Sequence, residues 1–188
     1  MRVTKAKVAE HRRSILDSAS RLFRQRGFRD VGVAEIMQAS GLTHGAFYGH
    51  FRSKAELADE ACQEACAEGV QAWLASASLT EILDRYLTPA HRDNPAAGCA
   101  LAALGAEVAR QPDDVQKSYA DGMRRFVDAL ERHMDDAPPE ARRQQAMAVL
   151  SCMIGALTLA RGVASGDPAL SDQILASVRQ ELRGHFGA

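Results

Sequence analysis

Apolar residues recur at intervals of three and four along nearly the whole chain, which is the spacing of one face of an α-helix. Glycine, proline and capping residues divide this pattern into nine segments. We therefore predict an all-α fold of about nine helices, at residues 8–26, 33–40, 43–50, 54–75, 78–87, 98–110, 112–136, 140–164 and 168–186. Residues 91–95 are predicted to form a loop. The low aromatic content of 5% also favours helix over sheet.

Two short helices joined by a tight turn are predicted between Val33 and Lys54. Ser40-Gly41 ends the first, because glycine can take the left-handed conformation that a helix end requires. Thr43 offers a side-chain oxygen that can cap the second. Phe47 and Phe51 share a face that can point inward, which leaves four polar side chains for a partner: Thr43, His44, Tyr48 and His50. This pattern is typical of a helix-turn-helix, whose second helix enters the major groove of DNA.

Residues beside this second helix also suit nucleic acid. Thr43 and His44 lie at its start, where base edges come within reach, and Gly45 allows close approach of the backbone. Ser53 and Glu56 form a capping box for the next helix. Lys54 then lies in a first helical turn, where backbone N–H groups and an ammonium group together suit a phosphate.

The net charge of −1 is unevenly distributed along the chain. Residues 1–54 contain eleven Lys and Arg and four Asp and Glu, a net charge of +7, whereas the remainder contains 12 basic and 20 acidic residues, a net charge of −8. A basic head on an acidic body indicates a polyanion-binding domain attached to a second domain. We place the boundary so that residues 1–53 form the helix-turn-helix domain and residues 54–188 form an effector-binding and dimerisation domain.

The segment 41–51 followed by Ser53-Lys54 resembles the TetR/AcrR family of bacterial transcriptional regulators, and residues 12–23 with Gly27-Phe28 resemble that family's first helix. The resemblance covers about residues 10–60. It implies phosphate contacts by Arg12, Tyr48, His50 and Lys54. The chain departs from the family at Val31-Gly32, where a hydroxyl is usual. Gly32 can cap the second helix but has no hydroxyl for a phosphate, which leaves the backbone N–H groups of Gly32 and Val33.

The resemblance further implies a ligand cavity in the body, and its apolar candidates suggest a small, hydrophobic or aromatic effector. The candidates to line it are Trp73, Tyr86, Cys99, Tyr119, Met123, Phe126 and Met153. A purely structural role in the core is the alternative for each of them. A group such as His91 could orient a polar end of the ligand.

The two C-terminal helices are both apolar, and the helix at residues 140–164 is apolar on much of its circumference. Together they would form a four-helix homodimer interface with a second copy, as the resemblance also implies. The expected interface residues are Leu150, Met153, Leu157, Ala160, Ala164, Ile174, Val178 and Leu182. The alternative is that both helices only close the core of one chain.

The four cysteines lack the short paired spacings of a disulfide framework, which fits a reducing cytoplasm. Cys99 follows Gly98 near a predicted helix N-terminus and could be thiol-reactive, although a small core residue is the alternative. Cys62 and Cys66 lie four residues apart, but no histidine has matching spacing, so no metal is predicted. No cofactor is predicted either.

The absence of a signal peptide and of an apolar run of about 20 residues predicts a cytoplasmic protein without a membrane segment. No nucleophile elbow, metal-ligand run or phosphate loop supports an enzyme. We therefore expect a dimeric, ligand-responsive regulator, most often a repressor, that binds a near-palindromic double-stranded DNA operator and is released by an effector. The alternative is a small-molecule-binding or thiol-reactive sensor, or an enzyme, that uses the head only as a scaffold.

Overall fold

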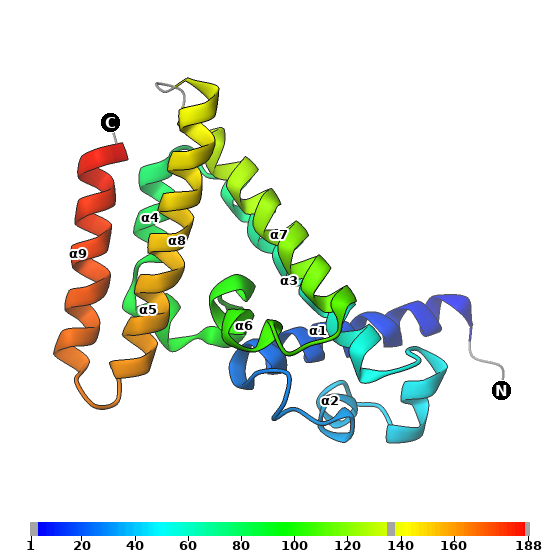
Figure 1. Cartoon of the computed structure of the whole chain (residues 1–188). Helices are drawn as coiled ribbons and strands as arrows, with labels where there is room; N and C mark the ends of the chain where they lie inside the picture. The colour runs from blue at the N-terminus through cyan, green and yellow to red at the C-terminus, as the bar shows by residue number, and fades with distance from the viewer. Residues whose placement is uncertain (1–3, 135–137, 187–188) are drawn as a thin grey trace.

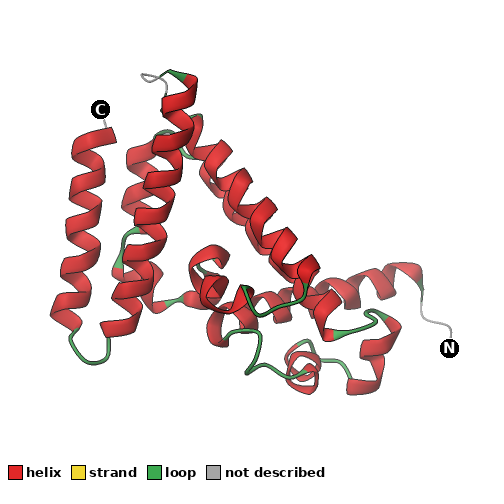
Figure 2. Cartoon of the chain, in the orientation of Figure 1, coloured by secondary structure: helices red, strands yellow, loops and turns green. Residues whose placement is uncertain are grey.

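A computed structural model describes residues 4–134 and 138–186, and every regular element in these ranges is helical (Figure 2). The elements are α1 (Lys5–Arg26), α2 (Val33–Ala39), η1 (His44–Gly49), α3 (Lys54–Leu74), α4 (Leu79–Tyr86), α5 (Pro89–Asp93), η2 (Pro95–Ala97), α6 (Ala100–Val108), α7 (Asp113–Glu131), α8 (Pro139–Val163) and α9 (Pro168–Phe186). The elements η1 and η2 are 3-10 helices. The predicted all-α fold is confirmed.

The helices enclose a triangle when viewed as in Figure 1. Helix α1 lies along the lower edge, with α2 and η1 below it. Helix α3 leaves this head and packs against α7 along the sloping edge, while α8 and α9 pack together on the opposite side. The short helix α6 lies inside the triangle and contacts α1, α3, α7 and α8. This central position gives α6 contact with both the head and the body.

Local sequence accounts for most helix ends. Ser53 caps α3 by accepting a hydrogen bond from the Glu56 N–H, and the Glu56 carboxylate accepts one from the Arg52 N–H at 2.6 Å. Ser78 caps α4 in the same way. Gly27 after α1 has φ 84°, a conformation that residues with a Cβ rarely adopt. The predicted capping box at Ser53 and the predicted end of the first helix at residue 26 are confirmed.

Several elements differ from the sequence-based expectation. The helix predicted at residues 43–50 is a 3-10 helix, and the Thr43 side chain makes no capping hydrogen bond. The predicted loop at residues 91–95 is largely helical, because Thr88 and Asn94 cap two short turns that each begin with proline. Helix α1 begins at Lys5, three residues early, since Thr4 caps it. Helix α7 ends at Glu131, and its predicted end at residue 136 lies outside the described residues.

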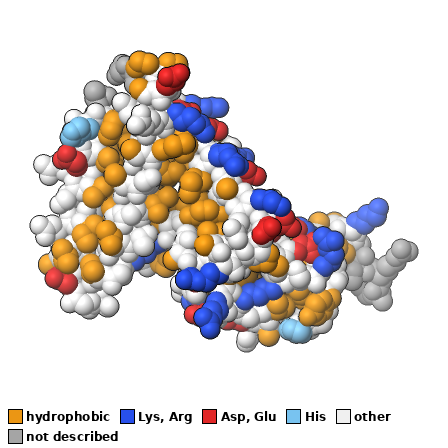
Figure 3. All heavy atoms as spheres, in the orientation of Figure 1, with side chains coloured by type: hydrophobic (Ala, Val, Ile, Leu, Met, Phe, Trp, Pro, Cys, Tyr) orange, Lys and Arg blue, Asp and Glu red, His pale blue; other side chains and the backbone are white. Residues whose placement is uncertain are grey.

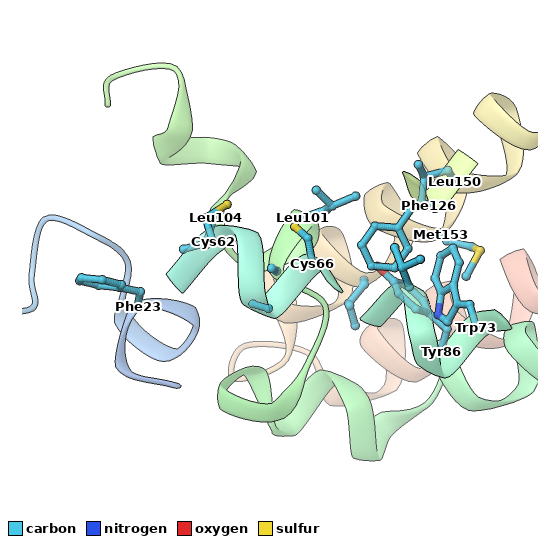
Figure 4. Close-up of a cluster of buried hydrophobic side chains, with 14 of the residues drawn as sticks. Phe23, Cys62, Cys66, Trp73, Tyr86, Leu101, Leu104, Phe126, Leu150 and Met153 are labelled. Atoms are coloured by element: carbon cyan, nitrogen blue, oxygen red, sulfur yellow. The ribbon is translucent and has the colours of Figure 1, made fainter. Parts of the chain in front are cut away.

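Two groups of side chains fill the core. In the head, α1, α2 and η1 bury Ile15, Ala19, Phe23, Ile36, Met37 and Phe47. In the body, Trp73 from α3, Tyr86 from α4, Phe126 from α7 and Met153 from α8 converge on one cluster (Figure 4). Because Phe47 of η1 is buried with residues of α1 and α2, the packing of the head fixes the position of η1 and of its outward side chains.

Helix α8 is long and apolar enough to cross a membrane by length and composition, with a mean hydropathy of 1.7 over its most apolar window. The expectation that no apolar segment approaches the length of a membrane span was wrong by the measure of length and composition. Its buried residues pack into the helical body, and its neighbours in the fold are α5, α6, α7 and α9. The apolar composition of α8 is therefore accounted for in part by its place in the core.

Candidate nucleic-acid interface and internal cavity

The turn between α2 and η1 is set by Gly41. Its φ of 74° lies in the left-handed region, and its N–H donates to the Gln38 carbonyl. The next N–H, of Leu42, donates to the Met37 carbonyl at 2.9 Å. The half-buried Leu42 side chain packs against the core. These contacts turn the chain sharply and fix the direction in which η1 leaves α2.

The two sides of η1 differ in burial. Phe47 is buried and stacks on Phe51, with 5.9 Å between ring centroids. On the opposite side Thr43, His44 and Tyr48 are exposed, and the Tyr48 side chain is 67% exposed. Tyr48 is therefore not a buried core residue. The short helix thus presents polar side chains outward while its aromatic side anchors it to the head.

Glycines in and beside this segment are not required by packing within the chain. A Cβ built on Gly32, Gly45 or Gly49 would meet no heavy atom within 4 Å. The φ angles of these three glycines are not positive. Close approach of another molecule to the backbone would be a reason for glycine at positions where the fold itself does not need it.

The side chains proposed to meet phosphates differ in availability. Lys54 donates from Nζ to the Phe28 carbonyl at 2.5 Å and is half-buried. Arg12 places Nη2 2.6 Å from both carboxylate oxygens of Glu60 and lies over the Phe51 ring at 4.5 Å. A phosphate contact by either side chain would compete with these internal partners for its remaining N–H donors.

His50 lies at the end of η1 against α1. Its Nδ1 is buried without a hydrogen-bond partner among the described residues, and its ring meets the His11 ring at a centroid distance of 6.1 Å. Burial lowers the pKa of His50, and the nearby His11 and Arg12 lower it further. The lowered pKa favours the neutral His50 ring in the chain without DNA.

Sequence reasoning missed how far the basic head is neutralised from within. Helix α3 carries Glu60, Glu64 and Glu68 at intervals of four residues, and this row faces α1. Arg12 pairs with Glu60, and Arg13 pairs with both Glu64 and Glu68. The four-residue spacing of the acidic residues was the pattern that could have revealed this row.

A second missed contact joins the head to α6. The Glu107 carboxylate accepts hydrogen bonds from the backbone N–H of Phe28 at 2.9 Å and of Arg29 at 3.2 Å. The Phe28 carbonyl in the same loop is held by Lys54. The loop that follows α1 is thus held by one side chain from α6 and by one from the first turn of α3.

The body contains a cavity of about 450 Å³ between α3, α4 and the segment around η2. Four of the predicted ligand residues line it: Trp73, Tyr86, Cys99 and Phe126. The other three are not on the wall. Met153 is fully buried in the same cluster as Trp73, Tyr119 donates its hydroxyl to the Leu101 carbonyl, and Met123 is partly exposed. The cavity has the size and the apolar wall of a small-molecule site.

His91 lines the cavity but is not free to orient a ligand. Its Nδ1 lies 2.7 Å from the Tyr86 carbonyl, and its Nε2 accepts a hydrogen bond from the Cys99 N–H at 3.0 Å. Because both ring nitrogens are occupied, the expectation of a polar contact by His91 was wrong. Burial lowers the pKa of His91, which favours the neutral ring that this bonding pattern needs.

The structure places the predicted dimer residues in two environments. Leu150, Met153, Leu157, Ala160 and Leu182 are buried within the chain's own core, which matches the alternative of core closure for them. Ala164, Ile174 and Val178 are half-buried. The apolar side chains of α8 and α9 that remain exposed include Met147, Leu159 and Leu170, and Figure 3 shows hydrophobic side chains gathered over this side of the body.

Cys62 and Cys66 are buried on α3. A hydrogen bond between their thiols lowers the pKa of Cys62 and raises that of Cys66. Within residues 4–134 and 138–186, no group of three or more His, Cys, Asp and Glu residues is placed to hold a metal ion.

Comparison with known proteins adds to this geometry. The family model described as bacterial regulatory proteins, tetR family, matches residues 15–61, which include α2, η1 and most of the head. The chain is 46% identical to the HTH-type transcriptional regulator AcrR of Shigella flexneri over 59 residues, which are 31% of this chain and 27% of AcrR. The chain therefore spans about a quarter of the length of AcrR in this match.

Other similarities extend over the whole chain. The HTH-type transcriptional regulator LmrA of Bacillus subtilis is 26% identical over 185 residues, which cover 86% of this chain and 92% of LmrA. The crystal structure of a TetR transcriptional regulator from Legionella pneumophila superposes with a TM-score of 0.76 at 17% identity, covering 99% of this chain and 100% of that one. At that identity the superposition concerns the fold alone. Residues 15–61 therefore match the TetR family of bacterial regulatory proteins, and the chain as a whole is similar in sequence to LmrA and in fold to a TetR regulator.

Proposed function

We propose that the chain is a dimeric, ligand-responsive transcriptional regulator that acts as a repressor. Its η1 segment contacts an operator in double-stranded DNA. The observation that carries this proposal is the outward row of Thr43, His44 and Tyr48 beside the unobstructed Gly45. Proteins named as repressors occur among its relatives. The remaining proposed DNA contacts are Arg12, His50, Lys54 and the backbone N–H groups of Gly32 and Val33.

A second copy of the chain supports binding to a near-palindromic operator. Two heads related by a two-fold axis can enter successive major grooves only if they lie roughly 34–36 Å apart, or a multiple of this distance. We propose that α8 and α9 form the interface through the face that carries Met147, Leu159 and Leu170. A dimer through this face would bury apolar side chains that are exposed in one chain.

The cavity is the proposed effector site, and α6 is the proposed connection from it to DNA. Cys99 lies on the cavity wall directly before α6, whereas Glu107 near the other end of α6 holds the head loop at Phe28. A ligand that shifts α6 would disturb that contact and change the positions of the two heads. An effector then lowers DNA affinity because it binds the conformation that does not match the operator.

The experiment is a gel shift of the purified protein on DNA from upstream of its own gene, repeated at several salt concentrations. Tyr48→Phe removes an exposed hydroxyl and should weaken binding to every duplex, while Thr43→Ala should change the preference between sequences. Tyr119→Phe is the matched control, because it removes a hydroxyl that is bonded inside the body. A protein with no salt-dependent affinity for any duplex would contradict the proposal.

The thiol-reactive alternative rests on Cys99. This thiol is half-buried and lies on the cavity wall, so a small reagent that enters the cavity could reach it. Mass spectrometry after mild alkylation of the native protein decides this alternative. An unlabelled Cys99 would end it.

A further inference from the structure

One corner of the cavity holds a buried hydroxyl group. The Tyr86 side chain lines the cavity and is only 4% exposed. Its hydroxyl lies close to the Cys99 thiol but has no oxygen or nitrogen acceptor among the described residues. Burial raises the pKa of this hydroxyl, and the neighbouring Cys99 raises it further. It is therefore a protonated donor at every physiological pH. A buried donor without an acceptor costs stability, which an acceptor on a ligand would restore.

Two guanidinium groups converge on the same corner. Arg24 from α1 lines the cavity and donates to the Ser20 and Gly98 carbonyls. Arg161 from α8 lies behind Gly98, donates to the His91 and Arg92 carbonyls, and would place Nη2 3.0 Å from a Cβ on Gly98. Burial lowers the pKa of both arginines. The corner therefore carries two partly desolvated positive charges.

Neither guanidinium forms an ion pair with a carboxylate within the part of the chain that the structure describes. Arg24 and Arg161 each donate only to backbone carbonyls there. Glu68 also lines the cavity and attracts Arg24 electrostatically, but its exposed carboxylate faces Arg13 at 3.6 Å and forms no ion pair with Arg24. The exposed Arg85 on the wall is a further positive charge. The wall thus has a net positive charge, and partly buried cations favour an anionic partner.

The part of the wall next to Tyr86 is aromatic. The rings of Trp73 and Phe126 meet edge to face at a centroid distance of 4.6 Å, and Trp73 also contacts the Tyr86 ring at 5.8 Å. All three rings line the cavity. A flat apolar group can lie against such a wall while its polar end reaches Tyr86.

We propose that the cavity binds a small organic anion with an aromatic body, such as an aryl carboxylate. The anionic group would lie at the corner, accept a hydrogen bond from Tyr86 and interact with Arg24, while the ring lies against Trp73 and Phe126. This proposal rests on the effector site proposed above and names the class of ligand that the site takes. Gly98 contributes by allowing Arg161 to approach the same corner.

The test compares three ligands of nearly equal shape and different charge: hydrocinnamate, its neutral amide hydrocinnamamide, and the cation phenethylamine. Trp73 is the single tryptophan of the chain, so its emission reports occupancy of this cavity. Excitation at the red edge of its absorption avoids the ligands' phenyl rings, and isothermal titration calorimetry gives an independent dissociation constant. We expect hydrocinnamate to bind about tenfold or more tightly than the amide, and the cation to bind most weakly.

The variants separate the hydroxyl from general packing. Tyr86→Phe keeps the ring and should weaken hydrocinnamate binding about tenfold, with a smaller effect on the amide. Tyr119→Phe is the matched control and should leave both constants unchanged, because that hydroxyl is bonded to the Leu101 carbonyl. Arg24→Gln keeps hydrogen-bond donors and removes the charge, so it should reduce the preference for the acid over the amide. Circular dichroism melting of each variant verifies that it is folded.

Three results would overturn the proposal: equal affinity for acid and amide, equal effects of Tyr86→Phe and Tyr119→Phe, or no calorimetric binding of any of the three ligands. A gel shift of the same samples distinguishes this failure from failure of the regulator function. If DNA binding persists while the ligand preference is absent, only the ligand class is wrong. If DNA binding is absent in all samples, the regulator function itself fails.

Discussion

Glu107 on α6 holds the loop that follows Gly27, which makes Gly27→Ala a sharp test of the fold. Gly27 has φ 84° and ψ 170°, a region that is almost restricted to glycine. A Cβ at this position would lie 2.6 Å from the Glu107 carboxylate carbon. The substitution therefore adds backbone strain and displaces the carboxylate that accepts from Phe28 and Arg29.

The expected magnitude follows from these two effects. Backbone strain of this kind costs about 1–3 kcal/mol. Each lost hydrogen bond to a charged acceptor costs about 1.5–3 kcal/mol, and partial solvent access to Glu107 favours the lower end. We expect Gly27→Ala to lower the free energy of unfolding by about 3–5 kcal/mol, and Glu107→Ala to lower it by about 2–3 kcal/mol.

A double-mutant cycle separates strain from displacement. When Glu107 is already alanine, Gly27→Ala should cost only the strain, so the coupling between the two changes should be about 2 kcal/mol. Urea denaturation followed by circular dichroism measures all four proteins. A cost of Gly27→Ala that is the same with and without Glu107 would refute the contact, and a cost below about 1 kcal/mol would refute the need for glycine.

Three further predictions concern the head, the cysteines and pH. Gly45→Ala should change stability by less than about 0.5 kcal/mol, because its Cβ meets nothing in the chain, yet it should weaken the gel shift; unchanged affinity would remove Gly45 from the interface. Alkylation of the exposed Cys152 on α8 should slow as protein concentration rises if α8 forms the dimer interface, whereas the rate at Cys99 should not change. The pKa of His50 and of His91 is lowered in the fold, so the unfolded chain binds protons first as pH falls below about 6.5 and stability decreases there. Urea midpoints at about pH 7.5 and about pH 5.5 test this, and His91→Gln should reduce the difference between them.

The parts of the fold that sequence predicts well are those that neighbouring residues determine. Ser53, Ser78 and Gly41 act within a few residues of their own positions, so their caps and turn could be inferred from spacing alone. The short helix η1 was predicted in position but not in type. Its length of six residues leaves its hydrogen-bond pattern to the packing of Phe47 against Phe51.

Contacts between distant segments were beyond the sequence pattern. The hydrogen bonds of Glu107 to Phe28 and Arg29 join residues almost 80 positions apart, and nothing in the local pattern marks them. Helix α8 presents a related difficulty, because it is apolar on several faces. Periodicity identified Met153 and Leu157 as apolar but could not tell whether they face the chain's own core or a second subunit.

In the head, a correct count of charged residues overestimates how many cations are available to bind phosphates. The surplus of +7 in residues 1–54 suggests many cations available to phosphates, but the acidic row on α3 already binds two of the arginines of α1. If Arg12 contacts a phosphate by leaving the Glu60 carboxylate, DNA exchanges one ion pair for another and the net gain for this contact is small. The polar side chains of η1 are exposed and form no such ion pairs, so they must then provide most of the discrimination between sequences. The same exchange would leave the Glu60 carboxylate on α3 without its partner. DNA binding at Arg12 would therefore change the electrostatic environment of α3, the helix that packs along α7 into the body.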